Sequence, residues 1–158
     1  LYSEAFTEND TGCLTTGKII PLDEVPAMDF REWKEIGKDI NSDDVNLQNV
    51  GGYDHNFVLR KGLAMGLCAS VYHEESGRYM EVITDQPGVQ LYTACTTNCA
   101  GGRGGVTSGN YSGLCLETQH FPDTPNHSNF PTTVLRPGEK YDTTTIYAFR
   151  VEEDDDEE

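Results

Sequence analysis

The sequence predicts an all-β fold, an antiparallel β-sandwich built from many short strands. Sixteen glycines and seven prolines among 158 residues favour frequent turns over long helices. Short runs of β-forming residues alternate with turn signals along most of the chain. We expect one domain over residues 1–151, followed by an acidic, disordered tail over residues 152–158.

The N-terminal third carries the weakest strand signals. Residues 1–30 read as loop and short extended pieces. Residues 32–36 predict a helical turn or a short helix that ends at Gly37. Residues 41–49 are polar and predict an exposed loop. The next expected strand is at residues 53–59.

Strand signals become stronger from Leu67 onward. Residues 67–73 and 78–84 predict the two strands of a hairpin, because Glu-Glu-Ser-Gly at residues 74–77 forms a turn between them. Asp85 to Gly88 predicts a second turn. A further strand is expected at residues 89–94.

The C-terminal third alternates loops and strands. A loop over residues 99–113 holds six glycines. The following segments are a strand at 114–119, a proline-rich loop at 121–131, a strand at 132–135 and a last strand at 142–151. This regular alternation supports the sandwich prediction.

The charge of the chain excludes two classes of partner. The formal net charge is −16, and the last seven residues are all acidic, which leaves −9 on the body. Phosphate backbones and anionic membranes are therefore poor partners. A neutral ligand such as a sugar meets no electrostatic objection. The sequence also has no apolar run of the length that crosses a membrane.

The cysteines and the glycine-rich loop give no sign of a metal or phosphate site. Five cysteines without framework spacing predict free thiols and a reducing, cytoplasmic location. Cys95 and Cys99 have no second pair to complete a zinc site. The glycines at 101–105 lack the Lys-Ser/Thr of a phosphate loop. We expect no metal and no cofactor.

The segment from Gly113 to Asp123 is the most informative. Leu114 and Leu116 alternate with Cys115 and Glu117, the period of a half-buried strand. The leucines and Glu117 therefore lie on opposite faces. A carboxylate on the inner face of a strand is costly unless a polar group meets it. The hydroxyl of a small molecule is one such group.

Four segments in sequence order resemble a known family. They are TGKI at 16–19 with DFR at 29–31; GYDHNFVL at 52–59; TDQPGVQLYT at 84–93; and LETQHFPD at 116–123 with Asn126, FP at 130–131 and LRPGE at 135–139. Together they resemble the C-terminal half of the aldose 1-epimerase (galactose mutarotase) family. The resemblance implies a galactose mutarotase-like supersandwich, of which this chain is only the C-terminal portion.

The resemblance also implies roles for three residues. Glu117 corresponds to the general base that takes a proton from the C1 hydroxyl of the sugar. Asp54 corresponds to a residue that accepts hydrogen bonds from sugar hydroxyls, although a turn-capping aspartate after Gly51 and Gly52 is the alternative. Gln90 matches a position that contacts the sugar in some members, and a strand-edge amide is equally compatible.

The implied reaction is the interconversion of α and β anomers of free hexoses such as galactose and glucose, without a cofactor. The family's two active-site histidines lie in the N-terminal half. We therefore expect this chain to be a fragment that is inactive alone and that needs the N-terminal half of the same protein. The four histidines of this chain are expected to be structural or solvated rather than catalytic.

Two alternatives stay open at this stage. A non-catalytic sugar-binding or regulatory module on the same fold would retain Asp54 and Gln90 without an acid histidine. A hexose-6-phosphate epimerase would need several arginines at its site, which suits this acidic chain less well.

Overall fold

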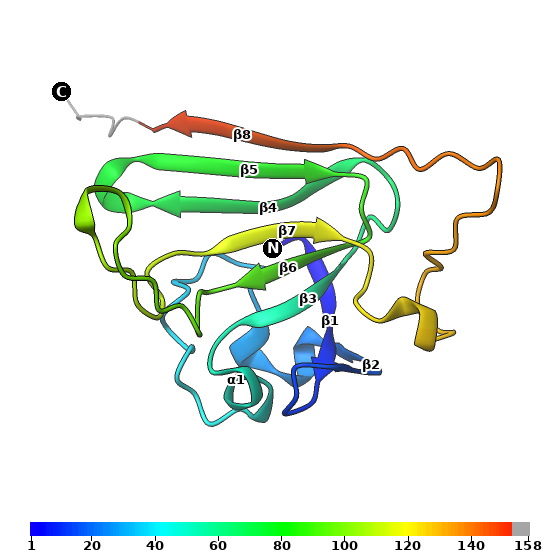
Figure 1. Cartoon of the computed structure of the whole chain (residues 1–158), viewed down its shortest axis with the longest axis horizontal. Coiled ribbons are helices and arrows are strands. Elements are labelled where there is room, and N and C mark those ends of the chain that lie inside the picture. Colours follow the sequence, from blue (N-terminus) through cyan, green and yellow to red (C-terminus); the bar gives the residue numbers. More distant parts are fainter. Residues whose placement is uncertain (153–158) are drawn as a thin grey trace.

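The computed structural model describes residues 1–152, and these residues form two antiparallel sheets (Figure 1). The larger sheet, sheet A, has the strand order β2-β1-β3-β6-β7, and the smaller one, sheet B, has the order β4-β5-β8. The strands are β1 (Ser3–Asn9), β2 (Thr15–Pro21), β3 (Asp54–Leu59), β4 (Gly66–His73), β5 (Arg78–Thr84), β6 (Gly88–Tyr92), β7 (Cys115–Gln119) and β8 (Thr145–Val151). The predicted antiparallel β-sandwich class is confirmed.

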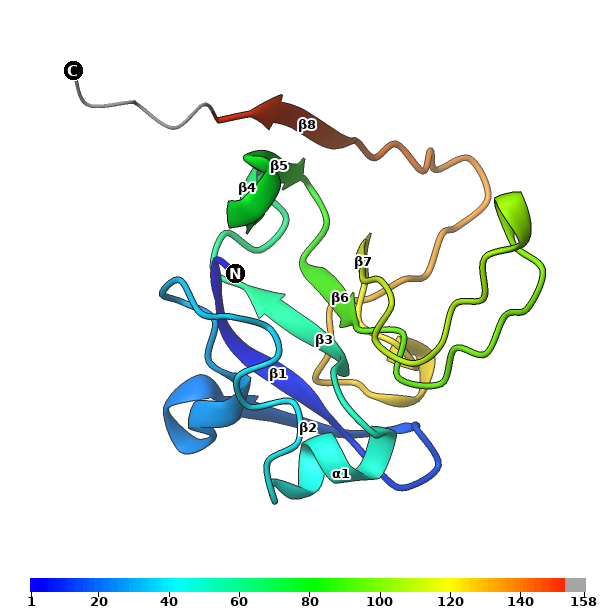
Figure 2. The same ribbon diagram turned by 90° about the vertical axis from the view of Figure 1, so that its left-hand side faces the viewer.

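The β4–β5 hairpin forms where the sequence predicts it. A 3-10 turn at Glu74–Ser76 connects the strands, and Gly77 follows it with φ of 63°, a left-handed conformation that glycine adopts without steric cost. β5 pairs with β8 along its whole length, from Arg78 opposite Val151 to Thr84 opposite Thr145. β8 is therefore one of the two edge strands of sheet B, the other being β4 (Figure 2).

One hydrophobic core joins the two sheets. Phe57 and Val89 of sheet A pack in the same cluster of buried residues as Ala69 and Val82 of sheet B. Burial of such side chains stabilises the fold by roughly 1.5–3 kcal/mol each. Tyr53 lies in this core and donates its hydroxyl to the carbonyl of Ala27 (2.8 Å), and burial raises the pKa of this phenol.

Side chains of β8 also tie sheet B to β7 at the edge of sheet A. The Tyr147 hydroxyl donates to the carbonyl oxygen of Leu116 (2.8 Å). The Thr145 and Thr118 hydroxyls lie 2.6 Å apart in a hydrogen bond. These two contacts flank Glu117 in the sequence of β7.

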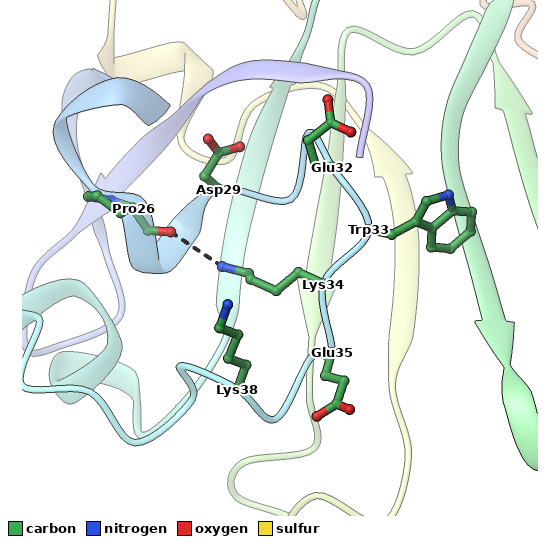
Figure 3. Close-up of a pocket in the computed structure, with 7 residues that line it drawn as sticks. All are labelled: Pro26, Asp29, Glu32, Trp33, Lys34, Glu35 and Lys38. Atoms are coloured by element: carbon green, nitrogen blue, oxygen red, sulfur yellow. Dashed lines mark hydrogen bonds between the residues drawn. The ribbon is translucent and has the colours of Figure 1, made fainter.

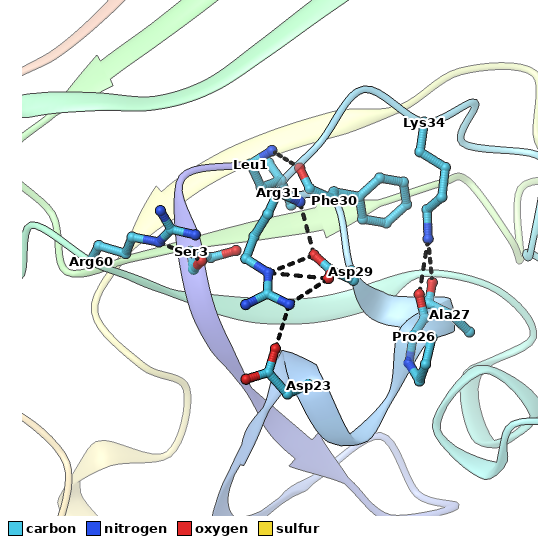
Figure 4. Close-up of polar contacts among 10 residues, drawn as sticks. All are labelled: Leu1, Ser3, Asp23, Pro26, Ala27, Asp29, Phe30, Arg31, Lys34 and Arg60. Atoms are coloured by element: carbon cyan, nitrogen blue, oxygen red, sulfur yellow. Dashed lines mark hydrogen bonds and ion pairs between the residues drawn. The ribbon is translucent and has the colours of Figure 1, made fainter.

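Arg31 organises the loop that follows β2 (Figure 4). Its guanidinium bonds the Asp29 carboxylate with two nitrogens, at 2.6 to 3.1 Å, and also reaches Asp23 at 2.5 Å. The hydrogen bonds from Arg31 keep the pKa of Asp29 below its ordinary value. Farther along, Lys34 donates to the carbonyls of Pro26 and Ala27 (3.3 and 3.0 Å).

Four expectations for irregular and terminal segments are wrong. Residues 3–9 form a full strand rather than loop and short extended pieces, and residues 45–50 form helix α1 (Val45–Val50) rather than an exposed loop. Residues 32–36 are not helical, and the Lys34 ammonium donates to the carbonyl of Ala27 in the preceding turn. Residues 132–135 form no strand and lie exposed. The other strands are confirmed, with ends shifted by up to three residues.

Two further expectations concern the acidic tail and membrane-spanning segments. Most of the expected tail, residues 153–158, lies outside the described residues. No helix among residues 1–152 has the length and apolar character needed to cross a bilayer.

Candidate functional site

The three residues singled out from the sequence lie on one face of sheet A. β3, β6 and β7 are consecutive neighbours in this sheet (Figure 1), and Asn56 is paired with Gln90, which is paired in turn with Glu117. Asp54 lies two residues before Asn56, so strand alternation puts it on the same face. We call this face, formed by Asp54, Asn56, Gln90, Glu117 and Gln119, the polar face.

The opposite face of the same strands belongs to the core. Phe57, Val89 and Leu91 are at most 3% exposed, and Leu116 is also buried. The alternation predicted for Leu116 and Glu117 is thus confirmed. The period-2 pattern gives each strand one apolar and one polar side.

Hydrogen bonds join the polar face into an amide ladder across the three strands. The Gln90 amide nitrogen donates to Oδ1 of Asp54 (2.7 Å). The Gln119 amide nitrogen donates to Oε1 of Gln90 (2.8 Å) and to Oδ1 of Asn56 (3.2 Å). We call these four residues, Asp54, Gln90, Gln119 and Asn56, the amide ladder.

Asp54 takes part in the sheet rather than in a turn. Its carboxylate accepts across the sheet from Gln90, and its backbone carbonyl accepts from the Asn9 amide (2.9 Å). This geometry does not match the alternative of a turn cap. Asp54 is only half-buried, so the carboxylate stays accessible to a ligand.

Glu117 is exposed and lies directly across from Gln90. A ligand hydroxyl on this face can therefore meet an accessible carboxylate from β7 and the Asp54–Gln90 pair together. Such an arrangement can accept hydrogen bonds, donate one from an amide, and take up a proton.

His55 lies on the reverse side of this arrangement, and His73 lies in sheet B. His55 follows Asp54 and points into the core, fully buried, with its ring edge-on to Phe6 (centroids 5.7 Å apart). Burial lowers the pKa of His55 to about 4, opposed only in part by the backbone of Asn46 and the charge of Asp44. His73 is exposed at the end of the β4–β5 hairpin, as expected.

Sequence reasoning missed Asn56 and Gln119. Both lie two positions after a residue that was singled out, Asn56 after Asp54 and Gln119 after Glu117. Period-2 alternation along a strand was the signal that could have found them. The cysteines carry free thiols, and residues 1–152 contain no cluster of three or more His, Cys, Asp or Glu side chains arranged for a metal ion.

A surface hollow of about 700 Å³ lies elsewhere, beside the loop after β2 (Figure 3). Its lining has charges of both signs and consists of Pro26, Asp29, Glu32, Trp33, Lys34, Glu35 and Lys38. Lys34 points toward the carbonyl of Pro26, whereas Trp33 points away from it. The polar face contributes no residue to this hollow.

Comparison with known proteins assigns the chain to a family. Residues 1–148 match the sequence model of aldose 1-epimerases. The chain belongs to the aldose 1-epimerase family. Galactose mutarotase of Rattus norvegicus is 41% identical over 152 residues, and aldose 1-epimerase of Escherichia coli is 35% identical over 129 residues.

Solved structures of family members share the fold. An aldose epimerase homologue from C. elegans superimposes with a TM-score of 0.83 at 26% identity, over 96% of this chain and 44% of that one. A galactose 1-epimerase from Lactobacillus acidophilus gives a TM-score of 0.79 at 25% identity. The chain thus spans less than half the length of its relatives, since the rat match covers 96% of this chain but 43% of the rat protein.

Proposed function

We propose that this chain is the C-terminal part of an aldose 1-epimerase that interconverts the α and β anomers of free hexoses such as galactose and glucose. The observation that supports this most is the convergence of Asp54, Gln90 and Glu117 on one polar face. Membership of the family and the name galactose mutarotase among the relatives point the same way.

In the proposed reaction Glu117 acts as the general base. It removes the proton of the C1 hydroxyl while the bond between C1 and the ring oxygen breaks, and an acid gives a proton to that oxygen. The aldehyde then rotates and the steps reverse, so no redox change occurs. Asp54 and Gln90 bind sugar hydroxyls and hold C1 within reach of Glu117.

The acid comes from outside this chain in this proposal. His55 points into the core and burial keeps it neutral, so it is a poor proton donor to the polar face. We place the acid, a histidine, in an N-terminal half such as the longer relatives possess, and the whole protein in the cytoplasm. The sugar would then lie between the polar face and that half.

A sugar-binding module without catalysis is the second candidate. The Asp54–Gln90 pair has the chemistry of a hydroxyl-binding site, and His55 of the same strand is buried in the core rather than directed at this pair. Such a module would bind galactose without changing the rate at which its anomers interconvert.

Polarimetry of the full-length protein separates these functions. We expect fresh α-galactose to mutarotate faster with enzyme, and Glu117→Gln to lower kcat by about 10²–10⁴-fold, because the base is lost while the shape is kept. Glu4→Gln, at an exposed position of β1, is the matched control and should leave the rate unchanged. A wild-type rate for Glu117→Gln would exclude Glu117 as the base.

The isolated 158-residue chain should be inactive in the same assay. It retains the proposed base but not the proposed acid. Mutarotation catalysed by this chain alone, abolished by Glu117→Gln, would show that the acid lies within it.

A further inference from the structure

The Asp54 carboxylate determines which groups of the amide ladder donate hydrogen bonds and which accept them. A carboxylate oxygen only accepts hydrogen bonds, so the Gln90 atom that faces Asp54 at 2.7 Å has to be the amide nitrogen. Gln90 therefore presents its oxygen to Gln119 on the other side. That oxygen needs a donor, and Gln119 supplies its NH₂ group at 2.8 Å.

Gln119 is in turn held by Asn56. The same Gln119 nitrogen donates to Oδ1 of Asn56 (3.2 Å), so both of its hydrogens are used. Asn56 is 1% exposed, so its side chain lies among protein atoms and out of contact with solvent. The ladder is thus anchored in the protein at Asn56 and ends at Asp54, where the site is open.

Gly88 makes room for this anchor. It lies across from Gln119 in the β6–β7 pair. A Cβ atom at position 88 would come within 2.3 Å of Oδ1 of Asn56, the atom that accepts from Gln119. The absence of a side chain at Gly88 therefore allows the Asn56 amide to occupy its place.

We propose that Gln119 is a positioning residue: by donating to Gln90 it keeps the Gln90 NH₂ group turned toward Asp54 and toward the ligand. Its effect on catalysis rests on the proposed function, in which Asp54 and Gln90 bind sugar hydroxyls. A Gln90 amide turned the other way would direct an oxygen at the Asp54 carboxylate, and two acceptors repel.

Gln119→Glu in the full-length protein tests this directly. The replacement is nearly isosteric, but an ionised carboxylate only accepts, so it draws the Gln90 NH₂ group away from Asp54. We expect KM for galactose to rise about tenfold, with a smaller change in kcat, because ground-state and transition-state binding are lost together. Gln119→Met, which has no donor and only a weak acceptor, should have a weaker effect.

Two controls separate positioning from general damage. Gln48→Glu adds the same charge at an exposed position of α1 and should leave KM unchanged. In a Gln90→Met background, Gln119→Glu should change KM by less than about twofold, because the residue through which it acts is absent. Equal effects of Gln119→Glu in both backgrounds would overturn the proposal.

A second readout needs no activity. In protein labelled with ¹⁵N-glutamine, the Gln90 side-chain NH₂ signals are identified by their loss in Gln90→Met. They should shift in Gln119→Glu and stay in place in Gln48→Glu. Unmoved Gln90 signals would overturn the proposal, whereas shifted signals in a protein without mutarotase activity would refute the proposed function alone.

Discussion

β1 and β8 are both seven-residue strands, yet they have opposite surroundings. β1 has neighbours on both sides, β2 and β3, and five of its residues are buried. β8 pairs only with β5, and none of its residues is buried. Phe6 of β1 is fully buried, whereas Phe149 of β8 is 75% exposed.

The difference separates a strand that is covered on both edges by the described residues from one that is covered on a single edge. Four large apolar residues of β8 are partly or largely exposed: Ile146, Tyr147, Phe149 and Val151. An exposed apolar edge strand is a ready partner for further chain. This exposed edge is where a further part of a longer protein, such as the relatives that are more than twice as long, would be expected to pack.

Truncating the two phenylalanines gives the largest expected contrast. In the 158-residue chain, Phe6→Ala should lower the free energy of unfolding by about 3–5 kcal/mol because it leaves a cavity in the core. Phe149→Ala should change it by no more than about 0.5 kcal/mol. Urea unfolding of both variants measures the two values.

The same two variants also test whether another part of the full-length protein covers sheet B. In the full-length protein Phe149→Ala should become clearly destabilising, while Phe6→Ala keeps its cost. If the two variants lowered the free energy of unfolding of the 158-residue chain equally, β8 would be buried in that chain. The contrast between the exposed Phe149 and the buried Phe6 would then be wrong.

Acid should lower the free energy of unfolding, because His55 is buried in the neutral form. Its pKa is about 4 when folded and 6.5 when unfolded, so below pH 6.5 the unfolded chain binds the extra proton. The stability that depends on neutral His55 is complete above pH 6.5 and is lost as pH falls to about 4. The loss amounts to ~3 kcal/mol.

Urea unfolding between pH 7.5 and about 4 measures this dependence. His55→Phe should flatten it, since the ring contact with Phe6 can remain while the proton site is gone. His73→Asn, at an exposed position of the hairpin, should leave the wild-type slope. A slope that His55→Phe does not reduce would assign acid sensitivity to other groups.

A methyl group at Gly88 tests how closely sheet A is packed on its polar face. Gly88→Ala should cost about 1–3 kcal/mol, because its Cβ would overlap Oδ1 of Asn56. Gly113→Ala adds the same atom where nothing lies within 4 Å and should be neutral. Thermal unfolding compares them, and indistinguishable midpoints would contradict the packing argument.

Loss of the Tyr147 hydroxyl is the smallest of these effects. Tyr147→Phe removes the hydrogen bond to the Leu116 carbonyl and should cost about 1 kcal/mol. Tyr72→Phe, at an exposed position of β4, is the control. If both variants unfold at the wild-type urea concentration, this contact between the sheets contributes nothing.

The sequence predicted those strands that have a regular pattern and a turn between them. The β4–β5 hairpin and β7 carry clear period-2 alternation or turn residues. β1 was missed because its buried positions include Ser3, Thr7 and Asn9, and because bulges interrupt its pairing with both neighbours. Polar side chains in a bulged strand give no alternation to read.

Other errors also have physical causes. α1 has only six residues, yet Asp44 caps it and Gly51 ends it in a left-handed conformation, so its boundary signals were present in the sequence. The family motifs pointed to Asp54, Gln90 and Glu117. The amide ladder could not be predicted, since it depends on the register that pairs β3 with β6 and β6 with β7.

The contacts from β8 to β7 bear on where such a protein can be shortened. Leu116 and Thr118, on either side of Glu117, are both held by β8, through Tyr147 and Thr145. A stop codon shortly before Thr145 would spare every residue of the polar face and still remove both of these supports. β8, the last strand among the described residues, thus supports both neighbours of Glu117, and shortening the chain before Thr145 changes the surroundings of Glu117 without removing any residue of the polar face.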